Sequence, residues 1–153
     1  MKIGVADRKI KLIALMLAVM MFVFPTVGAV AAEPVQSRAS SYLSSYQSYI
    51  YPAGGGELQI WFSVTATNYM DDLGALYIYL YESTDGTGNW TYVETFSHVN
   101  NSNMLLENDV FHMDHVIYQA VRGRYYKAYV CIWAGKDGGG DTRYFWTSVK
   151  KAT

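Results

Sequence analysis

The residue types most suited to chemistry gather in the segment Phe111-His112-Met113-Asp114-His115, which holds two histidines and an aspartate. Imidazole and carboxylate groups are ligands for zinc. On a strand, positions three apart point to opposite faces, so His112 and His115 converge only if they lie on a helical turn. His98 is the only other histidine, and no cysteine or acidic residue has a familiar ligand spacing. The sequence therefore predicts no metal site and no cofactor.

A second candidate for metal chemistry is the glycine-rich run Gly135-Lys136-Asp137-Gly138-Gly139-Gly140-Asp141. Aspartate oxygens and backbone carbonyls are calcium ligands, but the twelve-residue calcium loop with its terminal glutamate is absent. The glycines do not form a phosphate cradle, because no helix follows them to supply an N-terminus. We expect a long, flexible hairpin tip.

Catalytic groups are present without a catalytic arrangement. Hydrolysis of glycosides needs two carboxylates across a cleft, whereas Glu82, Glu94, Asp71 and Asp72 lie at strand ends and turns, where acidic residues are common. No serine lies in a nucleophile elbow. Nothing in the sequence gives Cys131 a reason to be a thiolate; it is expected to be a small hydrophobe on a strand, with an intermolecular disulfide as the alternative. We expect no catalytic residue and no enzymatic activity.

Aromatic residues form the strongest pattern, since all 14 tyrosines and all four tryptophans follow residue 32. Side chains alternate along a strand, so Tyr77, Tyr79 and Tyr81 share the face opposite Leu76, Ile78 and Leu80. In the same way Tyr125, Lys127, Tyr129, Cys131 and Trp133 share one face of a later strand, and Tyr144 and Trp146 share one face of the last. Trp61 is assigned to the outer face of an opposite sheet.

An exposed aromatic surface of this kind marks an interaction site, because Tyr and Trp anchor protein interfaces and stack on sugars. Two alternatives stay open: the rings stabilise cross-strand pairs, or the N-terminal segment covers them. The residues expected to bind a ligand, either a glycan or a protein, are Tyr77, Tyr79, Tyr125, Tyr129, Trp133 and Trp146.

Short alternating runs separated by turn residues must position these side chains, and this pattern is typical of antiparallel sheets. Asn68 to Gly74 is expected to be a turn and Asn100 to Asp109 a loop. The aromatic side of the fourth strand is left unassigned, because Val93 is the only aliphatic residue on its other side. The expected strands are 42–51, 57–67, 75–82, 90–97, 116–121, 124–134 and 142–150.

The first 32 residues have the order of a signal peptide. A basic start precedes the apolar run Leu12 to Phe24, Pro25 ends it, and small residues lead to cleavage between Ala32 and Glu33. An uncleaved anchor is the alternative, since 21 residues from Leu12 to Ala32 could span a bilayer. The expected organisation is a signal-peptide helix (1–32), a flexible tail (33–41) and a β-sandwich domain (42–153), secreted or associated with the cell wall.

The charge of the mature chain limits its partners. Of the 12 basic and 13 acidic residues, four basic and one acidic lie in the leader, so 8 basic and 12 acidic remain, a net charge of −4. Nucleic acid and anionic membranes require clustered Lys and Arg, and the chain has no such cluster. We expect no nucleic-acid partner, and membrane contact only through the leader; the oligomeric state is left open.

Gly123-Arg124-Tyr125-Tyr126-Lys127-Ala128-Tyr129-Val130 resembles the sixth strand of fibronectin type III and other immunoglobulin-like domains, in which a tyrosine closes the preceding corner. Glu82 to Gly86 followed by Trp90 resembles the turn after their third strand. The resemblance implies a two-sheet sandwich of about seven strands, in which the third, fourth, sixth and seventh strands share one sheet. A barrel is the alternative.

The mature segment also resembles small secreted proteins of unassigned function from Gram-positive bacteria. This resemblance rests on Tyr125 to Val130, Trp133 to Gly138 and Arg143 to Ser148. It implies secretion and supplies no activity. The expected function is a non-catalytic binding or surface-interaction module acting through the aromatic side chains. The alternative is a bacteriocin-like or toxin-like effector on a target cell envelope, which would inhibit the growth of some strain.

Overall fold

The computed structural model describes residues 40–153, which belong to one compact unit with its own core. The expected signal-peptide helix, the cleavage site at Ala32 and Glu33, and the tail before residue 40 lie outside the described residues. Within residues 40–153 no helix is long and apolar enough to cross a membrane.

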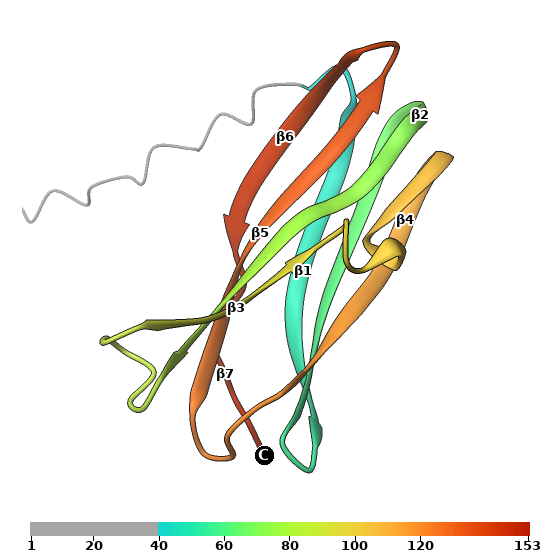
Figure 1. Cartoon of the computed structure of the whole chain (residues 1–153). Helices are drawn as coiled ribbons and strands as arrows, with labels where there is room; N and C mark the ends of the chain where they lie inside the picture. The colour runs from blue at the N-terminus through green and yellow to red at the C-terminus, as the bar shows by residue number, and fades with distance from the viewer. Residues whose placement is uncertain (1–39) are drawn as a thin grey trace, which may run out of the picture. The chain divides into compact units, whose positions relative to one another are not determined.

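The described chain is all-β, as the sequence predicts, and its strands form one antiparallel sheet (Figure 1). A single 3₁₀ turn, Ser102–Met104, precedes β4. The strands are β1 (Leu43–Gly54), β2 (Glu57–Ser83), β3 (Thr91–Ser97), β4 (Leu105–Gln119), β5 (Tyr125–Lys136), β6 (Gly139–Trp146) and β7 (Lys150–Lys151).

Strand β2 organises the sheet because it turns back on itself, so that its two halves lie in different parts of the fold (Figure 1). Its first half pairs with β1 on one side and β4 on the other. Its second half pairs with β5 and β3, and β6 extends the sheet beyond β5. We call these parts the β1–β2–β4 half and the β3–β2–β5–β6 half.

This continuity corrects two of the expected element boundaries. The expected third, fourth, sixth and seventh strands do lie together, as β3–β2–β5–β6. The expected turn at Asn68 to Gly74 is instead part of β2, and the expected loop before Asp109 is in part the start of β4. The reason is that the two segments pair: Met70 lies opposite Asp109, and Gly74 opposite Leu105. The result is an open, curled sheet whose halves share β2.

Alternation along the strands fills the concave side of the curled sheet with aliphatic residues. In the first half of β2, Leu58, Ile60, Phe62 and Val64 are all fully buried. The core is completed by the inward residues of the second half and of β5, which include Ile78, Leu80, Tyr126, Ala128, Val130 and Ile132. Burial of each large side chain contributes about 1.5–3 kcal/mol, so this core stabilises the unit without a disulfide.

One close approach requires glycine. Gly74 has a φ of 154°, and a Cβ at this position would collide with the backbone carbonyl oxygen of Met104. The 3₁₀ turn can therefore lie against β2 only where β2 has no side chain.

Candidate functional site

The outer side of the β3–β2–β5–β6 half carries rows of aromatic residues that cross neighbouring strands. Tyr79 on β2 lies opposite Tyr129 on β5, and Tyr129 lies opposite Trp146 on β6. One step along, Tyr81 lies opposite Tyr92 on β3. Residues in register on neighbouring strands share a face, so the sheet places side chains from four strands on one surface.

The rings on this surface are in mutual contact. The Trp146 ring lies 4.8 Å from that of Tyr129 and 5.3 Å from that of Tyr81. Tyr144 and Tyr92 join this cluster at 5.7 and 5.9 Å, and Tyr77 and Tyr79 form a further stacked pair at 6.0 Å. We call this surface the aromatic face and define it by Tyr77, Tyr79, Tyr81, Trp90, Tyr92, Lys127, Tyr129, Tyr144 and Trp146.

Three rings of the aromatic face are open to solvent: Trp146 is 48% exposed, Tyr92 53% and Tyr144 57%. Tyr77, Tyr79, Tyr81 and Tyr129 are half-buried. The inner members hold the outer rings in place, so an extended area of ring surface is presented on a rigid sheet. Whether the N-terminal segment covers it depends on residues outside the described part of the chain.

Lys127 is the one charged member of the aromatic face. Its Nζ lies 4.3 Å from the centre of the Trp90 ring and 4.4 Å from that of Trp146. An ammonium at this distance is attracted to the face of an indole ring by about 0.5–1 kcal/mol at exposed sites. Lys127 therefore links the loop before β3 to β6 across β5 and orients both indoles.

Two tyrosine hydroxyl groups of the aromatic face, those of Tyr79 and Tyr144, have pKa values above the usual one. Burial is the main cause that raises the pKa of Tyr79 above its usual value. A hydrogen bond with Cys131 raises the pKa of Tyr144. Burial also raises the pKa of the Cys131 thiol, which is 1% exposed. The buried cysteine therefore fits the expected small hydrophobe, and in this structure it is inaccessible to a thiol of another chain.

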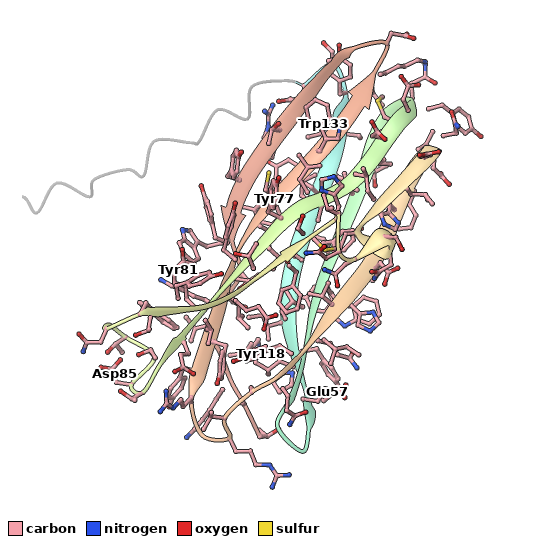
Figure 2. The ribbon with its side chains drawn as sticks, viewed as in Figure 1. Glu57, Tyr77, Tyr81, Asp85, Tyr118 and Trp133 are labelled. Carbon is pink, nitrogen blue, oxygen red and sulfur yellow. The ribbon has the colours of Figure 1, made fainter. Side chains whose placement is uncertain are left out.

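Four of the six residues expected to bind a ligand lie within the aromatic face: Tyr77, Tyr79, Tyr129 and Trp146. The other two, Tyr125 and Trp133, lie on the same side of the sheet but near the two ends of β5. A Cβ on Gly86 would lie 2.8 Å from the Tyr125 ring, and one on Gly135 would lie 2.7 Å from the Trp133 ring. Each ring is thus stacked on a glycine of a turn or hairpin. Figure 2 shows Tyr77, Tyr81 and Trp133 along this half.

Five members of the aromatic face were not among the expected ligand-binding residues. For Tyr81, Lys127 and Tyr144, the alternation along each strand already predicts a position on this surface. The positions of Tyr92 and Trp90 depend on strand register and on a contact with Lys127, which the spacing of residues does not show. A register shift between Leu80 and Tyr81 lets β3 place Tyr92 outside while Phe96 enters the core. The five residues are Tyr81, Trp90, Tyr92, Lys127 and Tyr144.

A separate aromatic group lies on the outer side of the β1–β2–β4 half, where the sequence placed Trp61. Trp61 is in register with Tyr49 on β1 and His115 on β4. Its ring stacks on His115 at 4.2 Å and on Tyr49 at 6.3 Å, with planes 20° and 8° apart. We call these three residues the stacked triad.

The expected divergence of the two histidines is confirmed. His112 is buried, with its ring 5.2 Å from that of Phe62 and its Nε2 2.8 Å from the Asn103 carbonyl oxygen. His115 points to the opposite side, in the stacked triad. Within residues 40–153 no three His, Cys, Asp or Glu side chains are grouped so that they could hold a metal ion.

The glycine-rich segment is a tight hairpin, which corrects the expected long tip. Lys136 pairs with Gly139, so only Asp137 and Gly138 form the turn. Both have positive φ values, 51° and 76°, as a two-residue type I′ turn requires. The backbone N–H of Asp137 donates a hydrogen bond to Asp71 Oδ2 at 2.7 Å. Asp71, one of the carboxylates considered for glycoside hydrolysis, therefore binds the hairpin turn.

A second of those carboxylates, Glu82, has a structural role. It forms an ion pair with Arg124 and accepts a hydrogen bond from the Tyr126 hydroxyl at 3.1 Å. The same hydroxyl accepts from the backbone N–H of Val121 at 2.9 Å. Tyr126 therefore closes the corner between β4 and β5, and burial is the main cause that raises its pKa to about 12.

The loop between β2 and β3 is organised by Asp85. Its Oδ1 accepts from the backbone N–H groups of Thr87 and Gly88 at 2.8 and 2.9 Å, and from the Ser83 hydroxyl at 2.9 Å. The N–H of Gly88 is the largest of the causes that lower the pKa of Asp85 to about 2. A lowered pKa means that the folded state favours the carboxylate.

This pKa predicts a pH-dependent contribution to stability. Because the folded-state pKa lies below the ordinary value, the contribution of Asp85 is present above about pH 4 and is lost as pH falls through about 2. We expect Asp85→Asn, which keeps an acceptor oxygen, to lower the Tm at pH 7 and to reduce its decline between pH 4 and 2. Thermal unfolding of both proteins over this range checks the expectation; identical pH profiles would contradict it.

No family model and no curated protein matches the chain. Among solved structures it is similar to a family 76 glycoside hydrolase from a bovine Bacteroides thetaiotaomicron strain, at 14% identity and a TM-score of 0.32. The match covers 71% of this chain and 20% of the hydrolase chain. At that TM-score the similarity assigns neither a fold family nor an activity.

Proposed function

We propose that the protein is a secreted, non-catalytic binding module whose aromatic face binds a glycan. The observation that supports this most is the cluster around Trp146, in which solvent-exposed rings are held by half-buried rings of the same sheet. Large exposed apolar areas on soluble domains mark interaction sites. A rigid row of rings binds without a large loss of side-chain entropy.

The chemistry of the face favours a neutral, hydroxyl-rich ligand. Its only charged member, Lys127, is already held between two indoles. The tyrosine hydroxyls both donate and accept hydrogen bonds, and the rings offer flat apolar surface. A sugar presents C–H faces and hydroxyl groups that match both features. Because the surface spans four strands, a polymer suits it better than a small molecule.

A glycan and cell-wall polysaccharide array with the Glu33–Thr153 chain tests this proposal. Intrinsic tryptophan fluorescence is followed on every hit. We expect binding to at least one polysaccharide, accompanied by a change in tryptophan emission. Failure to bind any glycan would overturn the proposal and direct the search to protein ligands, which use the same Tyr and Trp anchors.

Lys127 offers a prediction about how the face is organised. Lys127→Met keeps the apolar stem and removes the cation, so both ammonium–indole contacts are lost. We expect the free energy of unfolding to fall by about 1 kcal/mol and the Kd for the glycan to rise several-fold, because Trp90 and Trp146 lose their fixed orientation. Denaturant titration and binding measurements check this. Lys127→Arg is the matched control and should retain both the stability and the glycan affinity of the wild-type chain. A Lys127→Met variant with unchanged stability and affinity would contradict the proposed role of the ammonium group.

We also propose that the curled sheet is a relative of the immunoglobulin-like sandwich. The strand order β3–β2–β5–β6 agrees with the sheet expected from that resemblance. Tyr126, whose hydroxyl bonds to the backbone five residues upstream, resembles the tyrosine that closes a corner in those domains. A solved structure in which the two halves superpose on such a sandwich would support this, and a closed barrel would overturn it.

A further inference from the structure

Strand β1 is an edge of the sheet with an unusual composition. Within residues 40–153 it pairs only with β2, so one side of its backbone has no strand partner. Its twelve residues, LSSYQSYIYPAG, include no charged side chain. A long, uncharged edge strand is a template for pairing with another chain, which most proteins prevent with charges or covering segments.

The other edges of the described sheet carry such protection. Strand β3 is short and contains Glu94, and β7 is two lysines. Strand β4 contains Glu107, Asp109 and Asp114. Strand β6 contains Asp141 and Arg143, which form an ion pair. These strands therefore follow the usual pattern for edges that stay unpaired. Strand β1 carries no charge, and Pro52 and two register shifts interrupt only its ends.

Solvent reaches β1 along nearly its whole length. Only Leu43 and Ile50 are buried among its twelve residues, and the run Ser44 to Gln47 is exposed throughout. Tyr51 is 55% exposed. One ring of the strand, that of Tyr46, contacts Phe145 on β6 at 5.1 Å, whereas the outward side chains of Ser45, Gln47, Tyr49 and Tyr51 are open to solvent.

The stacked triad leads to this same edge. Its rings cross from His115 on β4 through Trp61 on β2 to Tyr49 on β1, where the row ends with Tyr49 38% exposed. Further along the same strands, Ile117 and Met113 are also exposed on this side. An adjacent sheet with the same surface would continue the row of rings beyond Tyr49.

We propose that β1 pairs antiparallel with β1 of a second copy of this chain, forming a symmetric dimer with one continuous sheet. A two-fold axis pairs residue i of one strand with residue j of the other and j with i, so residues at the axis lie opposite their own copies and equal charges near it come close together. Charged edge strands then suffer like-charge repulsion, which β1 avoids. Serine, glutamine and tyrosine side chains tolerate their own kind in cross-strand pairs. The aromatic face lies on the other half of the sheet and stays free for its ligand.

Sedimentation velocity of the Glu33–Thr153 chain over a wide concentration range tests the dimer. We expect a concentration-dependent species of twice the chain mass. The double variant Ser45→Lys/Gln47→Lys, which charges the free edge at exposed positions, is expected to be monomeric with an unchanged Tm. The matched control Asn100→Lys/Ser102→Lys adds the same charge on an exposed loop and should remain dimeric.

A wild-type chain that is monomeric at every concentration would overturn the proposal, as would a dimer that persists in the folded edge variant. Should the edge variant fail to fold, cysteine cross-linking gives an independent result. Oxidation should link two copies at the position nearest the two-fold axis when cysteine replaces each of six exposed β1 residues in turn, and should not link Tyr92→Cys on the aromatic face. The six are Ser44, Ser45, Tyr46, Gln47, Tyr49 and Tyr51. No cross-link at any of these positions would also overturn it.

Discussion

Replacing Tyr126 with alanine is expected to lower the free energy of unfolding by about 3–5 kcal/mol, the usual effect of removing a buried aromatic side chain. Tyr126 is fully buried, and its ring lies 5.9 Å from that of Tyr118. Its hydroxyl bonds both to the Val121 N–H and to Glu82. Both the cavity and the loss of these bonds destabilise the corner between β4 and β5.

Tyr129→Ala is the matched comparison, because Tyr129 lies on the same strand with the opposite orientation. It is half-buried, and its ring contacts are with Tyr144 and Trp146. We expect a loss of about 1 kcal/mol, typical of a cross-strand pair. Urea unfolding of both variants makes the comparison, and equal, small losses would contradict the assignment of the two faces of β5.

Tyr126→Phe separates the hydroxyl from the ring. It keeps the packing but leaves the Val121 N–H without its acceptor and Glu82 without one donor. A hydrogen bond contributes about 0.5–1.5 kcal/mol, and about 1.5–3 kcal/mol when one partner is charged, so this variant should fall between wild type and Tyr126→Ala. A Tyr126→Phe protein as stable as wild type would show that the hydroxyl does not hold the corner.

Replacing Tyr79 and Trp146 together with alanine is expected to raise the Kd for the glycan by about 100-fold or more, because aromatic anchors typically contribute 2 kcal/mol or more each. Both side chains lie on the solvent side of the sheet, so the Tm should change by only a few degrees. Binding assays and thermal unfolding of the same preparation measure both effects. A collapse in Tm would show that these residues belong to the core.

The stacked triad provides the control for this experiment. Tyr49→Ala/Trp61→Ala also removes a tyrosine and a tryptophan from an outer surface, but on the other half of the sheet. We expect glycan binding to remain at the wild-type level in this variant. Equal loss of binding in both double variants would mean that the ligand does not recognise the aromatic face specifically.

Local alternation was sufficient to assign the faces of the regular strands. Between Leu58 and Val64 every second residue is fully buried, and Trp61 between them is outside. The same rule predicted that Tyr126 points into the core and Tyr129 to the solvent side of β5. Period-two patterns succeed here because one side of each strand faces the core and the other faces solvent.

Long-range pairing was not accessible in this way. The polar segment from Asn68 to Gly74 has the composition of a turn, yet it remains part of β2 because Met70 to Gly74 pair with the start of β4. The cluster of Lys127 with Trp90 and Trp146 joins a loop and two strands, so no local spacing encodes it. The position of Tyr92 depends on a register shift that only the paired strand reveals.

The most direct test of the central claim is a fluorescence titration with a polysaccharide that the array identifies, using two single variants beside the wild-type chain. Trp61 lies on the β1–β2–β4 half and Trp146 in the aromatic face, so each indole reports on one surface. If the aromatic face binds the glycan, the emission change persists in Trp61→Phe and is largely lost in Trp146→Phe. A change that survives in Trp146→Phe and disappears in Trp61→Phe would place the ligand on the stacked triad and contradict the account.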